Sequence, residues 1–107
     1  MSILPGNLSP ADLQIVHRAL GATVEGPFFP EREFDTLFGL HRSEVRAIYE
    51  EWPSPACRSD RLLAAMIGSL NNLLGYPHKH EDALCRYFPE GRIALSATLA
   101  RLAALDG

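Results

Sequence analysis

Apolar residues recur at helical spacing over most of the chain. In the first segment the apolar positions are three or four residues apart, at Leu13, Val16, Leu20 and Val24. This spacing predicts an amphipathic helix. Ser9 can cap that helix, Pro10 suits its first position, and Asp12 lies near the positive end of its dipole. The pair Gly26-Pro27 ends it.

The same spacing predicts helices over 40–52, 59–74 and 93–105, and a shorter one over 80–88. The segment 59–74 has the widest apolar face, so we expect it to be the central helix. We find no strand-like alternation, internal repeat or low-complexity tract. The prediction is an all-α fold: a compact single-domain bundle of four to five helices over 1–107, with a short N-terminal tail at 1–8.

One segment departs from this pattern. Residues 26–39 hold four of the five phenylalanines, namely Phe28, Phe29, Phe34 and Phe38. Two glycines and two prolines prevent a long helix or strand there, although 31–38 has room for one or two short helical turns. We therefore expect an irregular Phe-rich segment after the first helix. Such a cluster either closes a small core or forms a binding surface, and the sequence leaves both open.

The charge is unevenly distributed. The chain has a net charge of −3, and residues 25–51 alone carry seven acids and three arginines. An acidic balance disfavours non-specific binding to nucleic acid, because that binding depends on neutralising phosphates. The local acid excess predicts either a solvated face or a surface for a basic partner. Nine of the ten basic residues are arginine, which we interpret as the composition of a GC-rich genome.

The cysteines and the lengths of the apolar runs indicate the cellular compartment in which the protein is expected. Cys57 and Cys85 do not make a disulfide framework. The N-terminus lacks the basic region of a signal peptide, and no apolar run reaches the ~20 residues of a membrane span. We expect a cytoplasmic protein with reduced thiols and no membrane contact.

Candidate chemistry is sparse. His78 and His80 are metal-ligand types, but a His-x-His in a loop lacks helical-pair geometry and has no second ligand cluster. They remain weak candidates, and we expect no metal and no cofactor. There is no glycine-rich phosphate loop, nucleophile elbow or zinc-protease motif. We therefore expect no catalytic residues and a non-enzymatic protein.

Two consecutive asparagines, Asn71 and Asn72, stand near the end of the apolar segment 59–74, where their low helix propensity is unfavourable. On a helical wheel Asn71 lies beside Ile67 and Leu74. We expect both asparagines to have a structural role, with Asn71 buried and tying down the Phe-rich segment through its side-chain amide. An exposed amide that binds a partner is the alternative.

The segment 37–48 has the spacing of a helix-turn-helix, with Gly39 in the turn and Val45 and Ile48 after it. Against DNA reading, Asp35 occupies a position where a small apolar residue normally packs. The second helix would also be acidic, carrying Glu44, Glu50 and Glu51 against Arg42 and Arg46. A DNA-binding regulator is therefore an alternative, with nucleic acid an unfavoured partner.

Residues 26–53 and 71–78 resemble a small family of bacterial proteins of about this length. The shared pattern is GPFFP…EF.TLFG…EV…WP…NNLLGYPH, and it covers roughly half of the chain. The resemblance implies that the Phe-rich segment and the asparagine-containing helix end belong to one unit. It implies no reaction and no catalytic residue.

These observations favour a small protein-interaction module with a basic partner, for example an inhibitor of the immunity or antitoxin type. Aromatic and arginine side chains supply much of the energy of interfaces when they are exposed. The candidate partner-binding residues are Phe28, Phe29, Glu31, Arg32, Glu33, Phe34, Asp35 and Phe38. A further alternative is a homo-oligomer, since the segment 93–105 is apolar around most of its circumference and suits a dimer interface.

Overall fold

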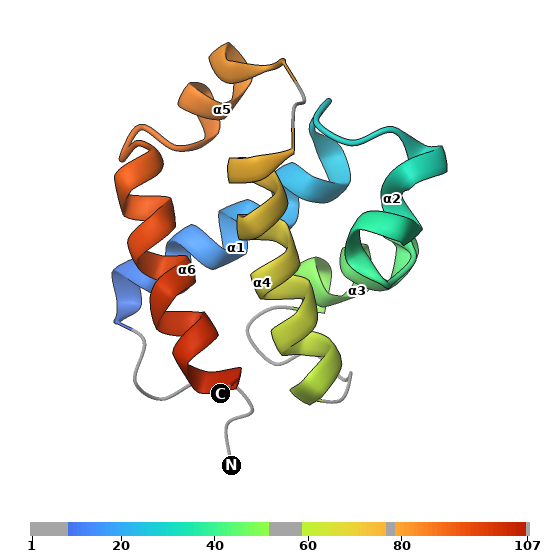
Figure 1. The fold of residues 1–107 in the computed structure, drawn as a ribbon, viewed down its shortest axis with the longest axis horizontal. Coiled ribbons are helices and arrows are strands. Elements are labelled where there is room, and N and C mark those ends of the chain that lie inside the picture. Colours follow the sequence, from blue (N-terminus) through green and yellow to red (C-terminus); the bar gives the residue numbers. More distant parts are fainter. Residues whose placement is uncertain (1–8, 52–58, 77–78, 107) are drawn as a thin grey trace.

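The computed structural model describes residues 9–51, 59–76 and 79–106. Figure 1 shows the helices of this part of the chain, which are α1 (Pro10–Glu25), α2 (Glu31–Phe38), α3 (Arg42–Glu51), α4 (Ser59–Gly75), α5 (Glu81–Tyr87) and α6 (Arg92–Asp106). None of the described segments is a strand, so the all-α prediction is confirmed. The predicted tail at 1–8 lies outside the described residues.

The helix count is six in the described part, not four to five. The difference lies in the Phe-rich segment, whose second half forms the regular helix α2 instead of isolated turns. Pro30 stands at the N-cap of α2 with extended backbone, and Gly39 at its C-cap has a φ of 68°. Left-handed backbone of this kind suits glycine, which has no Cβ to clash.

The central position of α4 is confirmed. It packs against α1, α2, α3 and α6, and its ribbon crosses the middle of the molecule in Figure 1. Its side chains Met66, Leu70 and Leu73 are fully buried. None of the described helices is long and apolar enough to cross a membrane.

The first helix begins as its sequence predicts. The Ser9 side chain accepts a hydrogen bond from the Asp12 N–H, and the Asp12 carboxylate accepts one from the Ser9 N–H, which is a capping box. At the other end, the Gly26 N–H donates to the Ala22 carbonyl. A Cβ on Gly26 would lie 2.6 Å from that oxygen and 2.7 Å from the Phe28 ring. Glycine therefore permits the sharp turn that folds Phe28 back into the core.

The Asp12 carboxylate also joins the two ends of the chain. It is 3% exposed and accepts hydrogen bonds from Thr98 Oγ1 at 2.9 Å and Arg101 Nε at 2.7 Å, both on α6. These bonds, chiefly those from Arg101, lower the pKa of Asp12 to about 2, although burial acts in the opposite direction. The ionised carboxylate therefore stabilises the packing of α1 against α6.

Arginines from elsewhere in the fold bind the C-terminal carbonyls of three helices. Arg42 donates to Thr23 and Val24 at the end of α1. Arg92 donates to the Leu74 carbonyl near the end of α4, and Arg18 to the Tyr87 carbonyl at the end of α5. The same arginines pair with Glu31, Glu81 and Glu90, respectively. A planar guanidinium suits this double task, because its donors reach a carbonyl and a carboxylate together.

Candidate interaction surface

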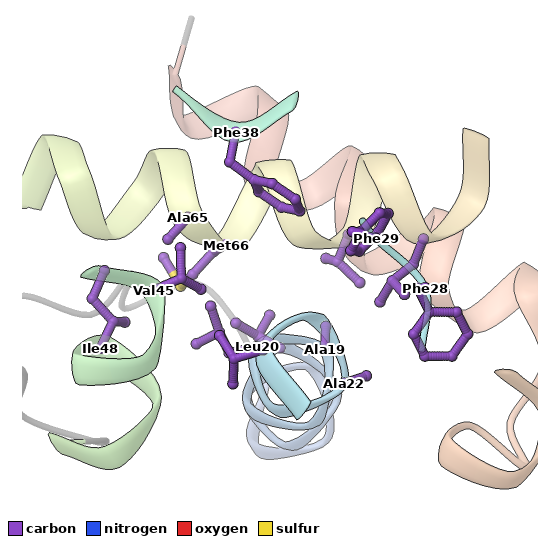
Figure 2. Close-up of a cluster of buried hydrophobic side chains, with 14 of the residues drawn as sticks. Ala19, Leu20, Ala22, Phe28, Phe29, Phe38, Val45, Ile48, Ala65 and Met66 are labelled. Atoms are coloured by element: carbon purple, nitrogen blue, oxygen red, sulfur yellow. The ribbon is translucent and has the colours of Figure 1, made fainter. Parts of the chain in front are cut away.

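The four phenylalanines predicted to bind a partner lie in the core. Phe28, Phe29, Phe34 and Phe38 are 1%, 4%, 0% and 7% exposed. Figure 2 shows three of them in one buried cluster with Leu20 of α1. The prediction of an exposed aromatic surface is therefore wrong, and the Phe-rich segment closes the core instead.

The physical reason is the geometry of α2. Phe34 and Phe38 are one helical turn apart, so they share a face, and their rings stack with centroids 4.4 Å apart. Phe29 meets Phe38 edge-on at 5.2 Å. The face packs against α4, where Gly68 lets the Phe38 ring approach within 3.0 Å of the position a Cβ would occupy.

Most polar residues of the predicted site are exposed, and some of them also form contacts within the fold. Glu31, Arg32 and Asp35 are exposed, and Glu33 is half-buried. Glu33 accepts a hydrogen bond from the Tyr76 hydroxyl at 2.9 Å, which raises the pKa of that phenol and joins α2 to the end of α4. Asp35 pairs with His41 Nδ1 at 2.8 Å across the turn that follows α2. The acids of α2 therefore support the fold as well as facing water.

Arg42 bonds to several neighbouring segments, and the sequence analysis did not predict this. Its side chain is 19% exposed, and its Nη2 donates to the Phe29 carbonyl at 2.8 Å, in addition to the two bonds to α1. Its guanidinium lies over the Phe34 ring at 4.5 Å, a cation–π distance. The Glu31 carboxylate accepts from its Nε at 2.5 Å. Arg42 thus joins α1, the Phe-rich turn and α2.

The second arginine of α3, Arg46, also contacts the end of α1, although its side chain is 40% exposed. Arg46 Nη2 donates to the Val24 carbonyl at 3.3 Å, and Nη1 lies 3.8 Å from Glu25. The exposed positions of α3 are then Ser43, Ala47, Glu50 and Glu51. The outward side of this helix is therefore neutral to acidic.

We define the acidic face as the exposed carboxylates between residues 25 and 51, all of which the structure describes. They are Glu25, Glu31, Asp35, Glu50 and Glu51. Of the three arginines in the same span, Arg32 is exposed while Arg42 and Arg46 are partly buried against backbone carbonyls. Arg42 and Arg46 also pair with Glu31 and Glu25, so the span keeps an excess of exposed carboxylates over exposed arginines.

The segment 37–48, predicted to hold a turn between two helices, spans the end of α2, a short turn and most of α3. Residues 39–41 join α2 to α3, and the two apolar positions predicted after the turn, Val45 and Ile48, are buried. Asp35 does not pack between the two helices but stays exposed in its pair with His41. Both arginines of the second helix donate to backbone carbonyls of the protein itself.

Of the two asparagines predicted to have a structural role, Asn72 has one, and the expected burial of Asn71 is wrong. Asn71 is exposed, whereas Asn72 is half-buried. Asn72 Nδ2 donates to the Leu37 carbonyl at 3.3 Å and to the Gly68 carbonyl at 2.9 Å. Asn72 follows Gly68 by one turn and so lies on the face that α2 covers. The amide therefore ties α4 to the Phe-rich segment, but from position 72.

The metal-ligand candidates do not form a site in the described residues. His80 is exposed, and its ring meets Phe28 edge-on at 6.3 Å. His78 lies outside the described residues. Where the structure describes the chain, it brings together no group of three His, Cys, Asp or Glu side chains able to hold a metal ion.

Comparison with protein-family models, with curated proteins and with solved structures finds no match to this chain. The resemblance to the bacterial family therefore stays a prediction from the sequence.

Proposed function

We propose that this protein is a non-enzymatic interaction module whose acidic face binds a basic protein partner. The proposal rests on the distribution of charged side chains in residues 25–51. Five carboxylates are exposed, while Arg42 and Arg46 bind helix carbonyls. A partner with a basic surface would meet an excess of negative charge there, since the span carries seven acids against three arginines.

An inhibitor of the immunity or antitoxin type is the specific form we propose. Such a protein covers a basic cleft by charge and shape, and it needs a rigid surface to do so. The buried Phe cluster and the Arg42 contacts supply that rigidity, because they fix α2 and α3 to α1. A rigid surface lowers the conformational entropy lost on binding.

The test is a pull-down from native lysate with nuclease present, read by mass spectrometry. The double variant Asp35→Lys/Glu50→Lys reverses two exposed carboxylates, and Asp82→Lys makes the same kind of change on α5, outside the acidic face. We expect the wild type and the Asp82 variant to retain one stoichiometric partner. The double variant should lose it by roughly tenfold or more, since like charges facing each other are repelled.

Equal recovery by all three proteins, with circular dichroism unchanged, would refute a role for the acidic face. Recovery of no partner by any of them would refute the interaction module itself. The exposed Asp35–His41 pair contributes little to stability, so its loss should leave the fold intact.

A second candidate function is DNA binding, which the helix-turn-helix arrangement of α2 and α3 favours. It requires positive charge on the outward side of α3, where Ser43, Ala47, Glu50 and Glu51 lie. DNA retention that falls steeply with salt would support it, because phosphate contacts release counterions. Retention that does not depend on salt would exclude it.

A further inference from the structure

Helix α5 is the shortest helix in the described part of the chain and lies at the edge of the molecule (Figure 1). It has seven residues, whereas helices shorter than ~12 residues are marginal in water on their own, so its stability depends on packing. Its N-cap residue, His80, makes no side-chain capping bond. Among the described helices, α1 provides most of the contacts of α5.

The packing around α5 is incomplete on two of its sides. A groove of about 450 Å³ separates residues 79–83 from Pro27, in the turn after α1. A second, apolar hollow of about 80 Å³ lies between α5 and α6, with Leu84, Phe88 and Leu95 in its lining. Protein interiors leave few voids larger than a water molecule, so α5 is held by fewer side-chain contacts than a core helix.

Residues with left-handed backbone stand on both sides of α5. Lys79 precedes the helix with a φ of 63°, and Gly91 follows it with a φ of 89°. Lys79 is the one non-glycine residue with positive φ in the part of the chain that the structure describes. This backbone is unfavourable for lysine, so a rotation at Lys79 that moves α5 would relieve strain. A few residues at the ends of an element are enough to form a hinge.

One arginine from another helix holds each end of α5. Arg18 of α1 donates to the Tyr87 carbonyl at 3.1 Å and to Glu90 Oε1 at 2.9 Å, at and just beyond the C-terminal end. Arg92 of α6 pairs with Glu81, the first residue of α5. Both ion pairs are partly exposed and are therefore weak.

We propose that residues 80–90, which include α5, form a lid that opens as a unit while the other helices stay folded. Lys79 and Gly91 are its hinges, and the two ion pairs hold it closed. Such sub-global opening is the behaviour of elements with few buried apolar contacts. The lid carries none of the carboxylates of the acidic face, so this inference does not depend on the function proposed above.

The closed lid hides an apolar surface. Leu84 and Phe88 are buried, and both belong to the lid. The ring of Phe28, which is 1% exposed, meets the Tyr87 ring edge-on with centroids 5.9 Å apart. Opening would therefore expose Phe28, together with Leu95 on the floor of the apolar hollow.

Hydrogen exchange of the full chain, read residue by residue by NMR, tests the lid. The Leu84 and Phe88 amides donate to the His80 and Leu84 carbonyls and report on α5, while the amides of buried Leu70 and Leu73 report on α4. We expect the α5 amides of the wild type to exchange at least about 100-fold faster than those of α4, because the lid opens without global unfolding.

Three substitutions separate lid opening from global unfolding. Arg18→Gln and Arg92→Gln each remove one ion pair of the lid, so each should speed exchange at both Leu84 and Phe88 by about threefold or more. Arg46→Gln is the matched control, since Arg46 also binds a helix-end carbonyl and a carboxylate but does so between α1 and α3. The control should speed exchange in α4 and leave that of α5 unchanged.

Three results would overturn the proposal. Equal exchange rates in α5 and α4 of the wild type would show that α5 opens only when the whole chain unfolds. Acceleration of α5 by Arg46→Gln as large as that by Arg18→Gln would show the same. Acceleration confined to the end of α5 next to the substituted arginine would indicate fraying instead of a lid that opens as a unit.

Discussion

Replacing Asp12 by asparagine tests the junction between α1 and α6. The carboxylate is 3% exposed and accepts bonds from Thr98 and Arg101, while also closing the capping box with Ser9. Asparagine keeps the size of the side chain and one acceptor oxygen, but it removes the charge that Arg101 binds. The variant therefore isolates the charged part of the junction.

The size of the expected loss in stability follows from the pKa of Asp12. Its lowering from 3.8 to about 2 corresponds to about 2 kcal/mol of stability, at ~1.36 kcal/mol for each pH unit. The sign follows from linkage: a carboxyl whose folded pKa is depressed stabilises the protein above its unfolded pKa. That contribution is present above about pH 4 and is lost as the pH falls towards 2.

Urea unfolding followed by circular dichroism measures both effects. At pH 7 we expect Asp12→Asn to lower the free energy of unfolding by about 2 kcal/mol. Between pH 4 and 2 the variant should lose less stability than the wild type, by the same amount. Asp82→Asn, an exposed acid on α5, is the control and should behave like the wild type at pH 7. A variant as stable as the wild type at pH 7, with the same acid dependence, would refute the role of the Asp12 charge.

Four further substitutions test three other contacts by the same urea assay. Arg42→Lys keeps the positive charge but loses the planar guanidinium that donates to three carbonyls, so the free energy of unfolding should fall by about 2–3 kcal/mol. A fall of less than ~0.5 kcal/mol would show that these bonds do not hold α3 to its neighbours. Gly26→Ala should destabilise by more than ~2 kcal/mol, because its Cβ would meet a backbone oxygen at 2.6 Å, and a neutral result would be evidence against that turn. Asn72→Ala should cost about 1–2 kcal/mol and Asn71→Ala less than ~0.5, with the reverse order refuting the assignment.

Local signals in the sequence predicted much of the fold. Ser9 and Pro10 gave the start of α1, and the wide apolar face of 59–74 gave the central helix. The regular helix α2 was predicted as only one or two short turns, because the prolines and glycines around the four phenylalanines are typical of irregular backbone. Pro30 before it and Gly39 after it are the usual boundary residues of a short helix, and they carried the missing signal.

The direction of the Phe side chains could not be predicted from the sequence. A cluster of aromatic residues has the same composition whether it faces a core or a partner. Its burial depends on whether another element covers it, and α4 does so at Gly68. The same limit explains the asparagines, since one helical position separates the covered Asn72 from the exposed Asn71.

The arginine content has a physical use that the sequence analysis missed. Arg18, Arg42 and Arg92 bind carbonyls at helix ends, and Arg101 binds the buried Asp12. These contacts join residues up to 89 positions apart, so no local spacing encodes them. Lysine could not replace them equally, because one ammonium group lacks the planar fork.

The central claim is that the acidic face binds a basic partner. The most direct test measures how much partner two charge-reversed variants retain in a pull-down. The double variant Asp35→Lys/Glu50→Lys is compared with Asp82→Lys, with nuclease present, at about 0.05 M and 0.3 M salt. The account predicts that the Asp82 variant retains the partner, more strongly at low salt, and that the double variant does not. Equal retention by the two variants, or retention that does not change with salt, would contradict it.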